Sequence, residues 1–112
     1  MSSQLDEEDL AQAWKFPGYD PTVREHVAIV QWLDEDCQKR DIWVNQILEG
    51  LASPETRAGY SREGNAFLLQ CVGDQCATVT IIDRSFPAAE GPAEVPVERI
   101  CSILKAYRPM CH

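Results

Sequence analysis

The feature that most constrains this chain is the stretch from residue 57 to residue 83, RAGYSREGNAFLLQCVGDQCATVTIID. Residues 65–71 and residues 75–83 each alternate apolar side chains with small or polar ones, and the second segment is rich in β-branched residues. This period of two is typical of strands that bury one face. The glycine in Val72-Gly73-Asp74 suits a tight turn between them because glycine adopts positive φ at little cost. The stretch therefore predicts an antiparallel hairpin with an apolar face that other elements must cover.

Two helices are expected before the hairpin. Asp20-Pro21 is typical of a helix start, since aspartate can cap a helix and proline fits its first turn. Apolar residues then recur at steps of three and four along one predicted helical face: Val23, Val27, Val30, Leu33 and Cys37. Residues 41–51 form a second apolar segment, which Gly50 and Ser53-Pro54 terminate. One helix of about 30 residues would be long for a small domain, so we expect a break near residues 37–41.

A last helix is expected from residue 96 to residue 107, where apolar residues again recur at helical spacing: Val97, Ile100, Cys101, Leu104 and Tyr107. Residues 56–61 are predicted to form a strand that leads into the hairpin. Residues 84–95, rich in proline, alanine and glycine, are predicted to form a surface loop. The predicted fold class is α+β: N-terminal helices, a central antiparallel hairpin or meander of about three strands, and a C-terminal helix packed on the sheet.

A single domain is expected over residues 1–112, since a chain of 112 residues matches the usual size of one hydrophobic core. Residues 1–12 are acidic and thinly apolar, which is typical either of a short capped helix or of a frayed terminus. This segment lacks the basic and apolar regions of a signal peptide, and no apolar run is long enough to span a bilayer. We therefore expect a cytoplasmic protein that binds no membrane.

The net charge of −8 lies entirely on the N-terminal half of the chain. Residues 1–56 hold twelve acids and four bases, whereas residues 57–112 hold six of each. An acidic surface repels nucleic-acid phosphates and anionic lipid, and it attracts a basic partner at long range. The same charge also serves solubility, so both interpretations stay open. The few basic residues form no stripe for nucleic acid.

Catalytic and metal-binding patterns are nearly absent from the sequence. The only histidines are His26 and His112, no nucleophile with a positioned base can be assembled around them, and no glycine-rich phosphate loop is present. The five cysteines lack paired spacing and are expected to be reduced thiols, although Cys71 and Cys76 flank the predicted turn. A zinc site that combines these two with Cys111 and His112 matches no common pattern. We expect no enzyme, no cofactor and no metal.

Three features of the C-terminal half carry a family resemblance: Gly64-Asn65-Ala66-Phe67 at a strand start, the Val72-Gly73-Asp74 turn, and the apolar helix over residues 97–107. In these features the chain resembles a group of small acidic bacterial proteins. The group includes immunity proteins of contact-dependent growth inhibition systems and a related uncharacterised proteobacterial family. The family's loop after the second hairpin strand is often a run of acids, whereas residues 85–94 hold only Glu90 and Glu94.

The resemblance implies an inhibitor that neutralises a cognate protein toxin, expected to be a basic nuclease domain, as a monomer in a 1:1 complex. The acids would steer the inhibitor to the basic site, and tryptophans would anchor it. The expected partner-binding residues all lie in the N-terminal half: Asp6, Glu7, Glu8, Asp9, Trp14, Trp32, Asp34, Glu35 and Asp36. Trp32 is expected to be exposed because it neighbours Leu33 on the predicted buried face. Two alternatives stay open: a dimeric secretion chaperone or adaptor for an effector, and a housekeeping interaction protein.

Overall fold

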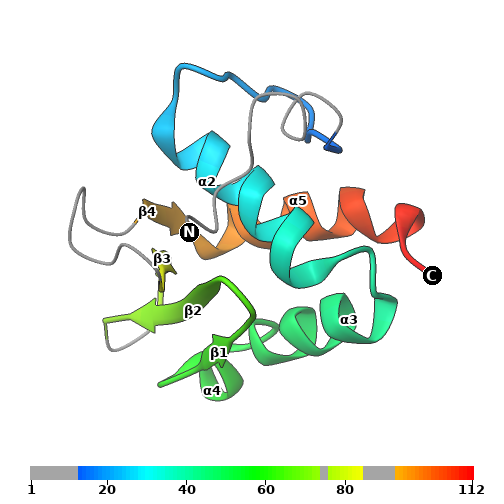
Figure 1. Ribbon diagram of the computed structural model, residues 1–112. Helices are drawn as coiled ribbons and strands as arrows, with labels where there is room; N and C mark the ends of the chain where they lie inside the picture. Colours follow the sequence, from blue (N-terminus) through cyan, green and yellow to red (C-terminus); the bar gives the residue numbers. More distant parts are fainter. Residues whose placement is uncertain (1–12, 74–75, 85–92) are drawn as a thin grey trace.

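A four-stranded antiparallel sheet with the strand order β1-β2-β3-β4 forms the centre of the molecule (Figure 1). The computed structural model describes residues 13–73, 76–84 and 93–112. Its strands are β1 (Ser61–Glu63), β2 (Phe67–Val72), β3 (Thr78–Asp83) and β4 (Ala93–Pro96). Its helical elements are α2 (Arg24–Trp32), the π-helical turn η1 (Leu33–Cys37), α3 (Asp41–Gly50), α4 (Pro54–Arg57), α5 (Val97–Tyr107) and the 3₁₀ turn η2 (Arg108–Met110). The predicted α+β class is confirmed.

The predicted hairpin is confirmed as β2 and β3, which pair antiparallel with Leu69 opposite Ile81. The predicted three-residue turn is wrong, because β2 ends at Val72 and β3 begins only at Thr78. Gly73 does adopt the positive φ expected of it, at 82°. The period-two pattern located both strands. The connection between them is longer than predicted because β3 begins at residue 78 instead of residue 75.

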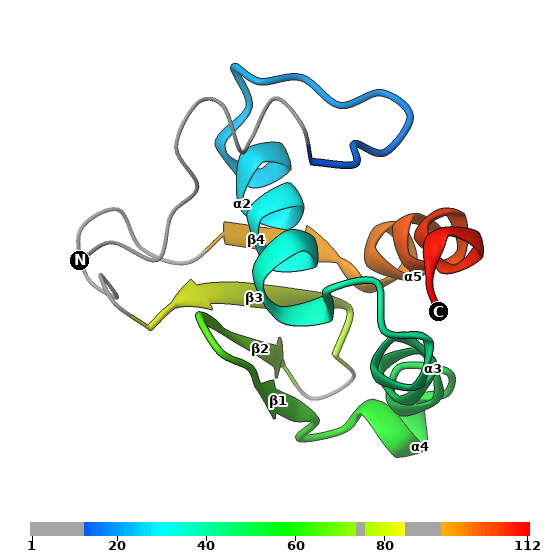
Figure 2. The same ribbon diagram turned by 45° about the vertical axis from the view of Figure 1, so that its right-hand side comes forward.

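Helices cover one face of the sheet, as the hairpin required. Figure 2 shows α2 crossing in front of β3, with α5 and α3 beside it, and both α2 and α5 contact β3 and β4. The strands bury alternate residues on this face: Phe67, Leu69, Val79, Ile81, Ala93 and Val95. The predicted C-terminal helix is confirmed as α5, which buries Ile100 and Leu104 against the sheet side of the core.

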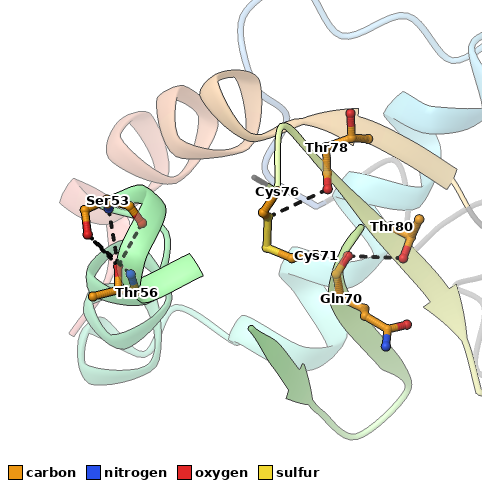
Figure 3. The surroundings of a disulfide bond; sticks show 7 residues. All are labelled: Ser53, Thr56, Gln70, Cys71, Cys76, Thr78 and Thr80. Atoms are coloured by element: carbon orange, nitrogen blue, oxygen red, sulfur yellow. Dashed lines mark hydrogen bonds between the residues drawn. A yellow bond between two sulfur atoms is a disulfide. The ribbon is translucent and has the colours of Figure 1, made fainter. Parts of the chain in front are cut away.

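Two predicted segments have a different structure. Residues 56–61 were expected to be a strand, but Pro54–Arg57 is the short helix α4 and the strand begins at Ser61. Ser53 caps this helix: its Oγ accepts from the Thr56 N–H at 3.4 Å, and the Thr56 hydroxyl accepts from the Ser53 N–H at 3.3 Å (Figure 3). Ser53-Pro54 was predicted to end the preceding helix, but a serine followed by proline is also typical of a helix start. Here the reciprocal cap makes it the start of α4.

The predicted loop over residues 84–95 is wrong at its end, where Ala93–Pro96 forms the edge strand β4. Residues 85–92 lie outside the described part of the chain. β4 pairs with β3 through Val95 opposite Val79 and Ala93 opposite Ile81. Proline is tolerated at the end of an edge strand because its missing N–H costs the ladder little. The proline and glycine content of the segment concealed this short strand.

The two-helix arrangement of the N-terminal half is confirmed, but the first helix starts later than predicted. Asp20 Oδ1 accepts from the N–H of Thr22 at 2.9 Å and from its hydroxyl at 2.7 Å, so Asp20 closes a turn ahead of α2 instead of capping it. The break between the helices falls at Gln38 and Lys39, whose φ angles are 51° and 54°. Two left-handed residues in succession cannot continue a right-handed helix.

Cys71 and Cys76 form a disulfide with a Cα–Cα distance of 5.1 Å (Figure 3). The expectation of reduced thiols is therefore wrong for this pair. We predict that replacing both cysteines with serine lowers the free energy of unfolding by about 2 kcal/mol, because a short closed loop restricts the unfolded chain. Urea denaturation of the wild type with and without reductant, beside the double variant, measures this. If reductant leaves the wild-type midpoint unchanged, the disulfide contributes no stability.

Among the residues that the structure describes, no helix combines the length and the apolar character needed to cross a membrane.

Candidate functional site

The N-terminal segment, the junction between α2 and α3, and the end of α5 together line a surface hollow of about 260 Å³. Its lining residues are Trp14, Asp34, Gln38, Lys39 and Tyr107. Of the predicted partner-binding residues, Trp14 and Asp34 are thus brought together, from positions twenty residues apart in the chain. We call this feature the Trp14 hollow.

The π-helical turn η1 sets the shape of the Trp14 hollow. Gln38 N–H donates to the carbonyl of Leu33 at 2.9 Å, which closes the wider turn of a π-helix. The left-handed backbone at Gln38 and Lys39 then turns the chain sharply into α3. The extra residue in the turn leaves Asp34 exposed while Leu33 and Asp36 are buried. Single π turns inside helices occur frequently at functional sites.

Tyr107 ties this turn to α5. Its hydroxyl accepts from the Lys39 N–H at 2.6 Å and donates to the Leu33 carbonyl at 3.3 Å. Burial raises the pKa of Tyr107 above its usual range, so this phenol keeps its proton for the second bond. The half-buried ring of Trp14 packs edge-on against the Tyr107 ring, with centroids 5.3 Å apart and planes at 61°. The hollow is therefore held together by residues that are up to 93 positions apart in the chain.

The acidic group at residues 34–36 does not form one surface. Asp34 is exposed and Glu35 is half-buried, but Asp36 is only 1% exposed. The Asp36 carboxylate accepts from the Ala66 N–H at 2.8 Å and from the Phe67 N–H at 3.1 Å. Asp36 is thus a structural residue that holds the start of β2, and its predicted role in partner binding is wrong.

Trp32 is also placed differently from its prediction, because it is 2% exposed. The expectation assumed that α2 buries a single narrow face, so that a neighbour of Leu33 would point to solvent. The helix instead buries consecutive side chains, from Ile29 through Leu33. Because α2 is covered on more than one side, its C-terminal end has no exposed face. Trp32 belongs to the core and cannot anchor a partner.

The remaining predicted residues lie elsewhere or outside the described chain. Asp6, Glu7, Glu8 and Asp9 fall within residues 1–12, which the structure does not describe. Trp43, a further tryptophan, is half-buried and stacked between two guanidinium groups, with Arg40 at 4.4 Å and Arg62 at 3.9 Å from its ring centroid. This stacking gives Trp43 a structural role on α3 and β1.

Sequence reasoning missed Gln38, Lys39 and Tyr107 as parts of the hollow. Tyr107 was assigned to the covering face of the last helix, which is correct, since it is 2% exposed. A signal was present: a tyrosine in an apolar helix face needs a partner for its hydroxyl, and that partner must come from another element. No comparable signal marks Gln38 and Lys39, since neither is a residue type favoured in left-handed backbone.

His26 packs between the turn at Asp20 and the ring of Phe16. Its Nδ1 accepts from the Asp20 N–H at 3.0 Å, and its ring packs edge-on against Phe16 with centroids 5.1 Å apart. Within the described ranges, no group of three or more histidine, cysteine or acidic side chains is arranged to hold a metal ion. These contacts tie the imidazole to the turn at Asp20 and to the buried Phe16.

Comparisons of this chain with models of protein families, with curated proteins and with solved structures found no match. The relation to immunity proteins therefore stays a prediction from residues 64–74 and 97–107.

Proposed function

We propose that this protein is an immunity-type inhibitor that binds a cognate toxin, a basic nuclease domain, in a 1:1 complex and occludes its active site. The observation that carries the proposal is the Trp14 hollow, where a half-buried tryptophan and an exposed aspartate share one concavity. The site of action would be the cytoplasm. A reducing cytoplasm would open the Cys71–Cys76 disulfide, but the β2–β3 register is also held by six cross-strand pairs.

The chemistry of the hollow suits a cationic side chain from a partner. Asp34 supplies an exposed carboxylate, and the half-buried Trp14 supplies an aromatic ring, which attracts cations through its π face. Lys39 lies on the same rim and offsets part of the charge of Asp34. Local attraction is therefore modest, and the aromatic contact is the larger source of affinity. An arginine from the partner would use both the aromatic ring and the carboxylate, since its planar guanidinium stacks on an aromatic ring and pairs with a carboxylate.

The charge of the whole chain supports the same kind of partner. The net charge of −8 is concentrated on residues 1–56, and the Trp14 hollow is built largely from that half. A nuclease presents positive charge where its substrate phosphates bind. An acidic inhibitor would be steered to that surface, which raises association rates by about 10- to 1,000-fold at low salt. Steering and a central aromatic anchor together are typical of fast and tight inhibition.

The proposal is tested by co-expressing this protein with the product of the gene next to its own, as the candidate toxin. We expect both chains to co-purify, a 1:1 mass by size exclusion with light scattering, and loss of nuclease activity at one equivalent of inhibitor. A complex that holds two copies of this protein and leaves the nuclease active would favour a secretion chaperone. A toxin that neither binds nor loses activity contradicts the proposal.

A further inference from the structure

A second and larger depression, of about 520 Å³, lies between the C-terminal end of α3, the short helix α4 and one flank of α5. We call it the α5 pocket. Its apolar lining comes from Leu48, Leu51 and Val97, of which Leu51 and Val97 are almost fully buried. A volume of this size lies within the range of pockets that bind small molecules. None of its lining residues belongs to the Trp14 hollow.

Two basic side chains line the α5 pocket. Arg57 on α4 and Lys105 on α5 both belong to its lining, together with the half-buried thiol of Cys101. Burial raises the pKa of Cys101, and the positive charges of Lys105 and Arg57 both oppose that rise. Glu98 also lines the pocket, and it lies seven residues before Lys105, which is about 10 Å along the helix axis. The pocket therefore holds two cations and one carboxylate in a chain of net charge −8.

Arg57 contributes a polar atom that lacks a partner. Its Nε is buried, and no acceptor for it exists among the described residues. A buried donor without an acceptor costs about 1–3 kcal/mol, so such groups are normally satisfied by protein, water or a ligand. The Arg57 guanidinium and the Lys105 ammonium both belong to side chains that line the pocket, so an anionic oxygen there would be attracted by both charges.

We propose that the α5 pocket binds a medium-chain fatty acid, with its carboxylate between Arg57 and Lys105 and its hydrocarbon chain over Leu48, Leu51 and Val97. The apolar lining and the two basic side chains match the two parts of such a molecule. Burial of each methylene adds to the affinity, and the carboxylate sets the orientation.

A free fatty acid fits this pocket better than a docked protein helix or a second copy of the chain. Helix recognition requires a row of exposed apolar anchors at helical spacing. The large apolar side chains exposed in the described part of the chain are Ile42, Val72 and Met110, and none of them lines the pocket. The apolar side chains of the pocket are therefore recessed, so a docked helix would find no exposed row of anchors there, whereas a short chain can enter the depression.

Titration of the free protein with decanoate tests this proposal. Calorimetry should give one site per chain, and amide shifts should change around Leu51, Val97 and Cys101. Acetate has the charge alone and decanol the chain alone, so each should bind at least about tenfold more weakly. The variants Arg57→Gln and Lys105→Gln should each weaken decanoate binding by about 10- to 100-fold, as expected for a lost charge-assisted bond.

Arg108→Gln is the matched control, because Arg108 is exposed, lies outside the pocket and loses the same charge. It should leave decanoate affinity within about twofold of wild type. Circular dichroism of each variant checks folding, and Lys105, which is exposed, provides the test if Arg57→Gln does not fold. Binding unaffected by both pocket variants, shifts centred on Trp14, or binding of acetate equal to that of decanoate would each overturn the proposal. The toxin is absent from this experiment, so its result is independent of the inhibitor function.

Discussion

Replacing Asp36 with alanine is expected to lower the free energy of unfolding by about 2 to 5 kcal/mol. The reason is that the buried carboxylate accepts from the N–H groups of Ala66 and Phe67, and its loss leaves both donors without a partner. Gly64 has no side chain at the place where this carboxylate packs, so the approach of the two segments depends on both residues. Urea denaturation followed by circular dichroism measures the change.

Asp34→Ala is the control for this prediction, since Asp34 is an exposed aspartate two residues earlier in the same turn. It should change the free energy of unfolding by no more than about 0.5 kcal/mol. Equal losses in the two variants would mean that Asp36 acts only through the general charge of the segment, and that its contacts to β2 contribute nothing.

The stability that Asp36 contributes should also depend on pH. Burial raises the pKa of Asp36 above its ordinary value of 3.8, against the opposing effect of the N–H groups of Ala66 and Phe67. The folded protein then binds this proton more tightly than the unfolded chain, so stability falls as pH rises through the raised pKa. The Asp36→Ala variant has no group to titrate here. The loss of unfolding free energy in Asp36→Ala, relative to wild type, should therefore be larger at about pH 4 than at about pH 7. A loss that grows as the pH rises would contradict this prediction.

Replacing Trp14 with alanine is expected to weaken toxin binding by about 30- to 1,000-fold, which is the effect of losing a central aromatic anchor. Trp14 packs its ring against Tyr107 and lines the hollow, so it offers contact area without a large loss of side-chain freedom. Trp14→Phe keeps an aromatic ring against Tyr107 and should retain most of the affinity. Calorimetry at one fixed salt concentration gives these values.

Trp43→Ala is the control for the anchor. Trp43 is a half-buried tryptophan whose ring is already stacked between Arg40 and Arg62. Its replacement should lower stability but leave toxin affinity within about threefold of wild type. If Trp43→Ala weakens binding as much as Trp14→Ala, the partner does not use the Trp14 hollow, and the effect of either variant comes from a loosened fold.

Much of the scaffold could be predicted because its signals are local. The alternation in β2 and β3 and the helical spacing in α5 each follow from which side chains face the core, and these elements were located within a few residues. The strand β4 was missed because four residues give too short a pattern to outweigh the prolines and glycine before them. The helix α4 was missed because its reciprocal cap involves only Ser53 and Thr56.

The candidate site was less predictable, because it depends on contacts between distant parts of the chain. Charge alone could not separate exposed Asp34 from buried Asp36, because what distinguishes Asp36 is its contact with the N–H groups of Ala66 and Phe67, 30 and 31 residues away. The position of Trp14 depends on Tyr107, ninety-three residues later in the sequence. The acidic composition pointed to residues 34–36 as a group, and only the fold divides that group into buried and accessible residues.

The central claim is that the acidic N-terminal half, acting through Asp34 at the Trp14 hollow, guides this protein to a basic toxin. Stopped-flow association of the toxin with wild type, Asp34→Lys and Glu94→Lys tests it most directly, since Glu94 is an exposed acid on β4, outside the hollow. At about 20 mM salt, Asp34→Lys should associate about three- to tenfold more slowly than wild type, and Glu94→Lys should differ from it little. At about 500 mM salt the three rates should converge, because screening removes the long-range attraction. Equal rates for the two variants at low salt would contradict the account.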